Sequence, residues 1–211
     1  IDHDRVEVSN LERQNFNYDE LGMFKAEALA IRLSHQFHRA IGYSLLPFSY
    51  DYGKFTPSLL IGCVDNAPAR AAIAEAVRPP QWWLDAGNGD DWGQVLIGNS
   101  QRCEGAFNPE KGLINTLPLP TIQRPELLVG PPLADISCAE GVEAGTQSPT
   151  INQAMATVVL ECVRRLLAGT CTWMQVYINL REPSLYAVEP TPELVSKITG
   201  VPKRRLLAER R

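Results

Sequence analysis

The sequence predicts an α/β fold in which helices cover both faces of an open, mostly parallel sheet. Two observations carry this prediction. Residues 58–64 form a nearly continuous apolar run, which is typical of a strand buried on both faces of a parallel sheet. The polar pair Asp65-Asn66 and an alanine-rich segment, 69–77, follow it, so that strand, turn and helix form a βα unit. Asp65 or Asn66 is suited to cap that helix, and Pro68 suits its first turn.

The other expected elements follow from the spacing of apolar residues. Helical periodicity runs from Gly22 to His38, and again from Ile151 to a stop at Gly169. The remaining expected elements are the end of a strand at Asp2, strands over 43–50, 81–86 and 93–98, a turn at 87–89, a hairpin of 172–180 and 185–188, and two short helices after Thr191.

One long segment has no such periodicity. Residues 101–145 are rich in proline and glycine, which predicts a long irregular crossover loop rather than a core element. The last residues, from 203 onward, are basic. A charge run at a chain end is typical of a solvated helix face or of disorder, so we assign it no binding role.

Composition excludes several classes of protein. A net charge of -4 gives no general attraction to nucleic acid or to an anionic membrane. The five cysteines form no C-x-x-C pair, which argues against a disulfide framework and against zinc. No apolar run approaches the ~18 residues of a membrane span. We therefore expect a cytoplasmic protein without nucleic acid, membrane or zinc as partners.

Four polar blocks that could carry chemistry occur in a fixed order. They are Asp2-His3-Asp4, the loop Ser9-Asn10-Leu11-Glu12-Arg13-Gln14, Gly22 with Lys25 at a helix start, and Asp65-Asn66 at a strand end. An acidic residue at a strand end is well placed to bind ribose hydroxyls. Taken singly, each residue also has an ordinary interpretation as a cap, a turn or a surface ion pair. The ordered set is what indicates a function.

This set resembles the ThiF, MoeB and ubiquitin-activating adenylyltransferases, which have a Rossmann-like sheet. The resemblance implies ATP-dependent adenylation of the C-terminal carboxylate of a small ubiquitin-like or sulfur-carrier protein, with ATP and Mg²⁺ as cofactors. Cationic side chains and Mg²⁺ would neutralise charge while the carboxylate attacks the α-phosphorus. The residues it assigns to the nucleotide are Asp2, Asp4, Asn10, Arg13, Gln14, Lys25, Asp65 and Asn66, with Arg13, Lys25 and Asp65 also catalytic and Asp65 serving Mg²⁺.

A cysteine after the crossover segment is a candidate nucleophile. Ubiquitin-activating relatives often form a thioester at a cysteine in this region, and Cys138 lies there. A reactive thiolate needs exposure and a nearby positive charge, whereas Asp135 and Glu140 would raise the pKa of this thiol. An ordinary loop cysteine therefore stays an equal alternative. Cys63, in the apolar run, and Cys162, on the helix stripe, are expected in the core.

The stretch 137–160 most resembles the ThiF-family protein of the bacterial PRTRC gene cassette. This resemblance implies a bacterial conjugation system, with a conjugating-enzyme-like protein as a further partner, and the family implies a homodimer. The family's first strand and glycine-rich phosphate turn do not occur in the sequence. Either they precede residue 1, or the protein does not bind ATP in the usual way. We interpret residues 1–189 as a ThiF-type nucleotide-binding domain and residues 190–211 as a C-terminal appendage.

Two other functions stay open on the sequence alone. Loss of the glycine-rich turn would favour a non-catalytic scaffold or binding partner with this fold. An acid at a strand end would also suit an NAD-dependent oxidoreductase. That second alternative leaves Arg13, Lys25 and Asp65 without a role, and ranks last.

Overall fold

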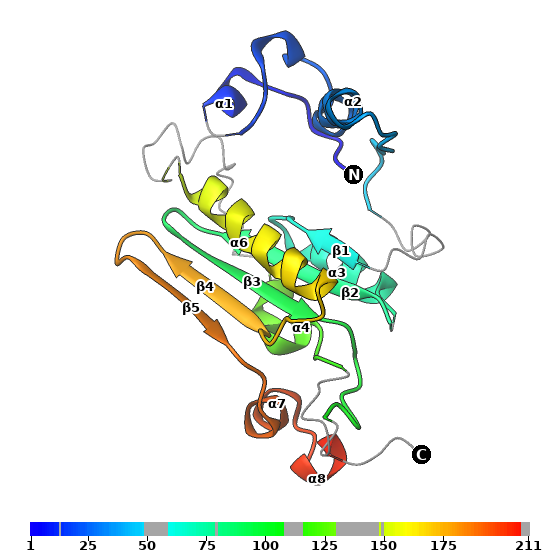
Figure 1. Ribbon diagram of the computed structural model, residues 1–211, viewed down its shortest axis with the longest axis vertical. Helices are drawn as coiled ribbons and strands as arrows, with labels where there is room; N and C mark the ends of the chain where they lie inside the picture. The colour runs from blue at the N-terminus through cyan, green and yellow to red at the C-terminus, as the bar shows by residue number, and fades with distance from the viewer. Residues whose placement is uncertain are drawn as a thin grey trace.

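The computed structural model describes residues 1–12, 14–48, 59–78, 80–107, 116–129, 148 and 150–207. A five-stranded sheet forms its centre, with the strands in the order β1-β2-β3-β4-β5 (Figure 1). The strands are β1 (Leu59–Gly62), β2 (Trp82–Asn88), β3 (Trp92–Gly98), β4 (Gln175–Asn179) and β5 (Ser184–Val188). The helices are α1 (Val8–Leu11), η1 (Tyr18–Glu20), α2 (Lys25–Phe37), α3 (Ala67–Ala76), α4 (Pro120–Gln123), η3 (Pro125–Leu128), α6 (Ile151–Leu167), α7 (Pro192–Thr199) and α8 (Lys203–Leu206).

Strand direction differs from the prediction. β1 and β2 are parallel, but the pairs β2–β3, β3–β4 and β4–β5 are antiparallel, so the expected mostly parallel sheet is wrong. Residues 89–91 alone connect β2 to β3. Parallel neighbours need a crossover of about a dozen residues, so this short link imposes the antiparallel direction. The predicted turn at 87–89 begins later than expected, because β2 continues to Asn88.

The apolar run that predicts a fully buried strand forms an edge strand instead. Within the described residues, β1 pairs only with β2, and Ile61 is 45% exposed. Cys63, which follows β1, is exposed, so its expected place in the core is wrong. Cys162 on α6 is fully buried, as predicted. An apolar run therefore identified the strand but not its place in the sheet.

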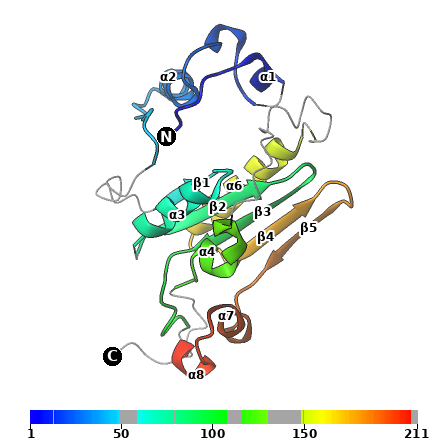
Figure 2. The same cartoon turned by 180° about the vertical axis from the view of Figure 1, so that it is seen from behind.

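Helices cover both faces of the sheet, as predicted. In Figure 1 α6 crosses in front of the strands, and in Figure 2, from behind, α4 lies over the opposite face. Alternate residues of β2 pack against the helices on opposite faces of the sheet, because successive side chains on a strand point to opposite faces. Leu84 packs in the same cluster as Met155 of α6, whereas Trp83 packs with Ile73 of α3 and with Leu119.

Several predicted elements are confirmed. The helical stripes correspond to α2 and α6, and the terminal hairpin corresponds to β4 and β5. The two short helices after Thr191 are α7 and α8. The cap of α3 also follows the prediction, since the Asn66 side chain accepts a hydrogen bond of 2.9 Å from the Ala69 N–H and Pro68 lies in the first turn.

Two predicted strands are wrong. Residues 43–48 form no strand, and positions 49 and 50 lie outside the described residues. Residues 1–4, including Asp2, also form no strand, and Arg5 makes only an isolated bridge with Phe24. The two segments meet at a backbone hydrogen bond of 3.1 Å from the Asp2 N–H to the Ser44 carbonyl, which alone does not make a pair of strands.

The crossover segment 101–145 contributes to the core where it is described, which corrects the prediction. Phe107, Leu117 and Leu119 are buried, and α4 and η3 lie within the segment. The Leu117 carbonyl accepts hydrogen bonds from the backbone N–H groups of residues 99 and 100, at 3.0 Å each. Backbone pairing thus holds this chain against the end of β3 without any helical or strand periodicity.

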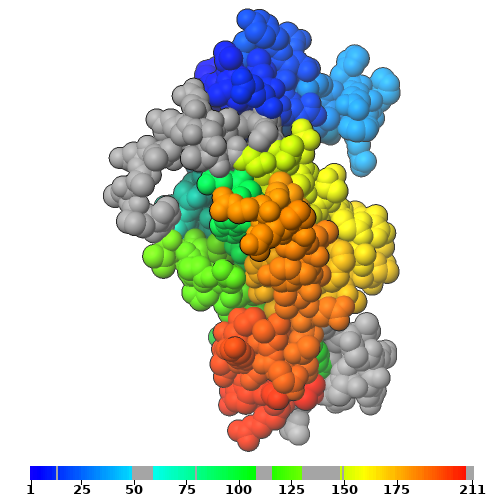
Figure 3. Space-filling model, turned by 90° about the vertical axis from the view of Figure 1, so that its left-hand side faces the viewer, coloured from blue at the N-terminus to red at the C-terminus, as the bar shows by residue number. Residues whose placement is uncertain are grey.

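The N-terminal segment 1–48 and the last helices lie at opposite ends of the molecule. Figures 1 and 2 show residues 1–48 beyond one end of the sheet and α7 and α8 beyond the other. In Figure 3 the N-terminal segment, the sheet region and the last helices follow one another in this order along the long axis. The carboxyl ends of β1 and β2 face the N-terminal segment. Val195 and Leu206 are fully buried in the main core cluster, which joins α7 and α8 to the sheet.

None of the helices in the described ranges has both the length and the apolarity that a membrane crossing requires. The outer face of α6 illustrates this, because it carries charged side chains. Glu161 accepts hydrogen bonds from Arg164 and Arg165, each with a shortest distance of 2.7 Å. These hydrogen bonds, Arg164 first, lower the pKa of Glu161 to about 2.

Glu161→Gln is expected to remove a pH-dependent part of the stability. Because the folded pKa of about 2 lies below the ordinary 4.5, this stabilisation is present above pH 4.5 and is lost as the pH falls toward 2. The thermal midpoint of the wild type should exceed that of the variant at pH 6 and match it near pH 2. Salt at ~1 M should shrink the difference, because the group is exposed. An equal difference at both pH values would contradict the assignment.

Candidate functional site

The first group of predicted residues assembles around Asp4. The Asp4 carboxylate lies 3.1 Å from Lys25 Nζ, at the start of α2, and the Asp4 carbonyl accepts a 2.8 Å hydrogen bond from the Lys25 N–H. The Asp2 Oδ1 in turn accepts a 2.9 Å hydrogen bond from the Asp4 N–H. The Lys25 side chain is only 15% exposed, so its ammonium group is held beside Asp4.

Asn10 lies in α1, and Gln14 lies in the loop that follows this helix. Asn10 is buried, and its Oδ1 accepts a 2.9 Å hydrogen bond from the Glu7 N–H, which closes a capping box on α1. The Asn10 carbonyl accepts a 2.8 Å hydrogen bond from the Gln14 N–H. Asn10 therefore fixes the loop through its oxygen atoms. Among the described residues, the Asn10 side-chain amide nitrogen has no partner, which leaves it available as a donor to a ligand.

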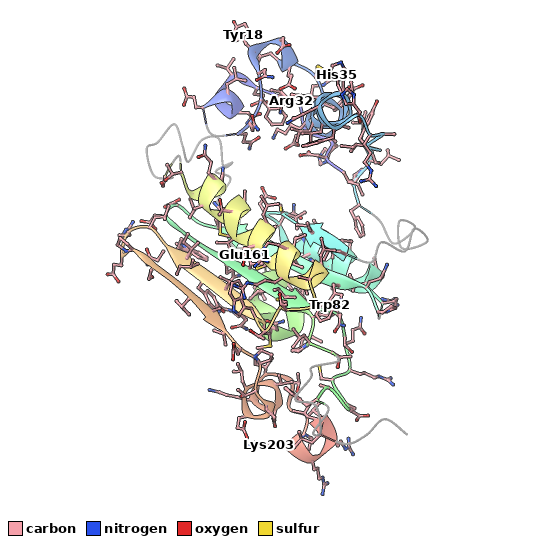
Figure 4. All side chains as sticks on the ribbon, viewed as in Figure 1. Tyr18, Arg32, His35, Trp82, Glu161 and Lys203 are labelled. Atoms are coloured by element: carbon pink, nitrogen blue, oxygen red, sulfur yellow. The ribbon has the colours of Figure 1, made fainter. Side chains whose placement is uncertain are left out.

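A partly buried ion pair lies between η1 and α2 in the N-terminal segment. Arg32 Nε lies 3.3 Å from Glu20, which is 6% exposed, and Arg32 also donates to the Asn15 carbonyl. In Figure 4, Arg32 and His35 lie on α2 and Tyr18 lies on η1, all within this segment, whereas Glu161 lies on α6. This ion pair thus joins η1 to α2.

The second group is Asp65 with Asn66, in the turn between β1 and α3. Both are exposed, and Asn66 Nδ2 donates a 3.1 Å hydrogen bond to Asp65 Oδ1. Asn66 is meanwhile the cap of α3, so its position is set by the helix start. The Asp65 carboxylate is therefore oriented by its neighbour and keeps an oxygen open to solvent. In open α/β sheets, ligands bind beyond the carboxyl ends of the strands, where Asp65 stands.

The structure places the predicted residues in two groups rather than one. The partners described above for Asp2, Asp4 and Lys25 belong to the N-terminal segment, and those of Asp65 and Asn66 belong to the β1–α3 turn. Both groups lie at the same end of the sheet (Figure 1). Arg13 and Cys138 lie outside the described residues.

The side chains of residues 2–4 lie close enough together to share a metal ion. The ligand-type atoms of Asp2, His3 and Asp4 all lie within 4.8 Å of one another. His3 and Asp4 are exposed, and Asp4 already forms an ion pair with Lys25. Carboxylate oxygens are the ligands that Mg²⁺ prefers, so Asp65 also has suitable chemistry.

Sequence reasoning missed a buried ion pair between α3 and β2. Arg70 Nε lies 3.1 Å and 3.3 Å from the two oxygens of Asp85, which is completely buried. Burial raises the pKa of Asp85 above its ordinary 3.8, while Arg70 acts in the opposite direction. The available signal was an aspartate inside the apolar run 81–86. Such a residue requires a buried partner.

Comparison with solved structures identifies the fold. One structure of E. coli MccB is 16% identical to this chain, with a TM-score of 0.58, over 89% of this chain and 54% of that chain. PaaA is also 16% identical, with a TM-score of 0.60, over 89% of this chain and 62% of that chain. The chain has the fold of these two proteins. No protein-family model and no curated protein sequence matches it.

The matched structures include complexes. MccB, a microcin C7 biosynthetic enzyme, has been solved with N-formylated MccA, and also with the ATP analogue AMPCPP together with MccA. The AMPCPP complex is 16% identical to this chain, with a TM-score of 0.59, over 89% of this chain and 54% of that chain. The chain spans a little over half the length of these MccB structures. The likeness at this identity concerns the fold.

Proposed function

We propose that this protein activates a carboxylate by ATP-dependent adenylation. In this reaction a carboxylate oxygen attacks the α-phosphorus of ATP. The bond between the α-phosphorus and the oxygen that bridges to the β-phosphorus breaks, and pyrophosphate leaves. The product is an acyl adenylate, and no oxidant or reductant is needed.

One observation carries this proposal. Asp65 is exposed at the carboxyl end of β1, held by Asn66, in a fold that MccB shares and in which MccB binds AMPCPP and MccA. The N-terminal segment supports it, because Lys25 and the Asn10 amide supply a cation and a donor there, and this segment lies at the same end of the sheet. Reaction between two anions requires such charge neutralisation.

The roles follow from the chemistry of each side chain. Asp2 would accept hydrogen bonds from the ribose hydroxyls, and Asp4 holds Lys25 in place. Lys25, Asn10 and Arg13 would bind the phosphates, with Gln14 as a weaker contact. The Asp65 carboxylate would help to hold the Mg²⁺ that accompanies the ATP phosphates, and this ion would neutralise charge on them.

The substrate we propose is the C-terminal carboxylate of a small ubiquitin-like or sulfur-carrier protein, acted on by a homodimer in a bacterial conjugation system of the PRTRC type. Cys138 would then accept the acyl group as a thioester: its thiolate attacks the acyl carbon, and AMP leaves. A conjugating-enzyme-like protein would be the next acceptor. The resemblance of the sequence blocks supports these assignments.

Asp65→Ala is expected to lower ATP–pyrophosphate exchange roughly 10²-fold, because a group that neutralises charge in the transition state contributes about this much. Exchange would be measured with radiolabelled pyrophosphate, with and without the candidate carrier protein. Cys138→Ala should retain exchange, since thioester formation follows adenylation. Glu75→Ala is the matched control, because it removes the same charge from the exposed face of α3.

Equal losses in Asp65→Ala and Glu75→Ala would argue against the proposed site. A folded wild type that shows no exchange with its carrier protein would instead favour the scaffold. Exchange that depends on the carrier protein would exclude the oxidoreductase, which releases no pyrophosphate.

A further inference from the structure

Arg70 stands where a ligand of the proposed site would reach it. It lies on α3, one helical turn after Asn66, and its guanidinium group extends to β2. An alanine Cβ placed at Gly87 would be 3.0 Å from Arg70 Nη2, so the guanidinium packs closely against the backbone of Gly87. The register pairs Gly62, the last residue of β1, with Asp85. The guanidinium group is therefore at the carboxyl end of the parallel pair, next to the turn that carries Asp65.

The guanidinium group is only partly used within the described residues. Its Nε donates to both oxygens of Asp85, at 3.3 Å and 3.1 Å. Its two terminal nitrogens, Nη1 and Nη2, have no hydrogen-bond partner among the described residues. Arg70 is 8% exposed. Neither terminal nitrogen is among the fully buried side-chain atoms without a partner, which in the described part of the chain are Trp83 Nε1 and Thr116 Oγ1. Both terminal nitrogens therefore reach solvent, and their N–H bonds can donate to a ligand.

The charges of Arg70 and Asp85 determine which kind of anionic ligand Arg70 can bind. Asp85 already neutralises Arg70, so the pair carries almost no net charge toward a ligand. A triphosphate would gain little there and would be repelled by the Asp85 carboxylate. The binding of a single carboxylate depends more on well-placed hydrogen-bond donors than on net charge. The Nη1–Nη2 edge of Arg70 offers it two parallel N–H bonds.

We propose that Arg70 orients the carboxylate of the substrate for its attack on ATP, with Asp85 and Gly87 fixing the guanidinium in place. This inference rests on the proposed adenylation, and it adds the residue that recognises the chain end. The same geometry would reject a C-terminal amide, whose NH₂ group would meet the N–H donors of Arg70.

The test is a binding comparison that needs no turnover. The probes are N-acetylglycylglycine and its C-terminal amide, titrated against the isotope-labelled protein by NMR. Wild type should bind the acid about tenfold more tightly than the amide, as the loss of one charge-assisted pair predicts. Arg70→Lys should lose this preference, because an ammonium group cannot form the two-point contact. The ATP affinity of the variant, measured separately, should change less than twofold.

Gly87→Ala is a second variant that keeps the arginine. Its Cβ would lie 3.0 Å from Nη2, so Nη2 must shift by a few tenths of an ångström and the acid preference should fall. Arg181→Lys is the matched control, because Arg181 pairs with Asp91 at 2.6 Å in an exposed ion pair. It should bind both probes like the wild type.

The outcomes separate the two proposals. An acid preference that survives in both Arg70→Lys and Gly87→Ala would overturn the role of Arg70, whether or not the wild type catalyses exchange. Weaker ATP binding with an unchanged acid preference would also overturn it, since Arg70 would then contact phosphate. A preference that depends on Arg70 in a protein without pyrophosphate exchange would overturn adenylation but keep carboxylate recognition.

Discussion

Gly98→Ala is expected to destabilise the protein by about 3 kcal/mol or more, the upper end of the range for forced overpacking. Gly98 ends β3, and a Cβ there would lie 2.0 Å from the carbonyl oxygen of Pro118 and 2.8 Å from Leu119 Cα. These are backbone atoms, which cannot rotate away as a side chain can. The free energy of unfolding would be measured by urea denaturation.

The reason that the chain near Pro118 cannot yield is its pairing with the end of β3. The Leu119 N–H donates to the Ser100 carbonyl at 3.0 Å, and Asn99 Oδ1 accepts a 2.8 Å hydrogen bond from the Leu117 N–H. Moving this strand-like segment would break those bonds. Gly42→Ala is the control, because nothing lies within 4 Å of its Cβ position and its backbone conformation suits alanine. It should change the stability by less than ~0.5 kcal/mol. Similar behaviour of the two variants would contradict the close approach.

Helices were predictable from the sequence because their evidence is local. The stripes of α2 and α6 repeat over several turns, and Asn66 with Pro68 identifies the start of α3. The direction and order of strands depend on the neighbours that each strand meets, and those neighbours are distant in sequence. The apolar run of β1 predicts a buried strand equally well for a central or an edge position. Only the assembled sheet shows that Ile61 is exposed.

The candidate site was predictable from the sequence where its residues are adjacent, but not where they meet across the fold. Asp65 and Asn66 follow directly from a strand and a helix cap, so their position could be inferred from adjacent residues. The ion pair of Asp4 with Lys25 joins residues that a loop separates, and periodicity contains no information about such a contact. Arg70 and Asp85 were missed for this reason, because each stands in an apolar segment and pairs across two elements.

Asp85→Ala is expected to destabilise the protein by about 3–5 kcal/mol, because it leaves the buried guanidinium of Arg70 without its counter-charge. Arg70→Met should lower the free energy of unfolding by a similar amount, since it leaves the fully buried Asp85 carboxylate without its cationic partner. The double variant Arg70→Met/Asp85→Leu should be far closer to the wild type. It leaves no unpaired charge, and its apolar side chains would join the cluster of Trp83 and Ile73.

A double-mutant cycle measures this coupling directly. Equilibrium unfolding of the wild type, Arg70→Met, Asp85→Leu and the double variant gives the interaction free energy, which should be at least ~2 kcal/mol. The exposed pair of Arg181 with Asp91 is the matched comparison, and its coupling should stay below ~1 kcal/mol. Additive losses at Arg70 and Asp85 would mean that the two charges are solvated separately. A near-neutral double variant that still folds would show that the ion pair is dispensable for stability.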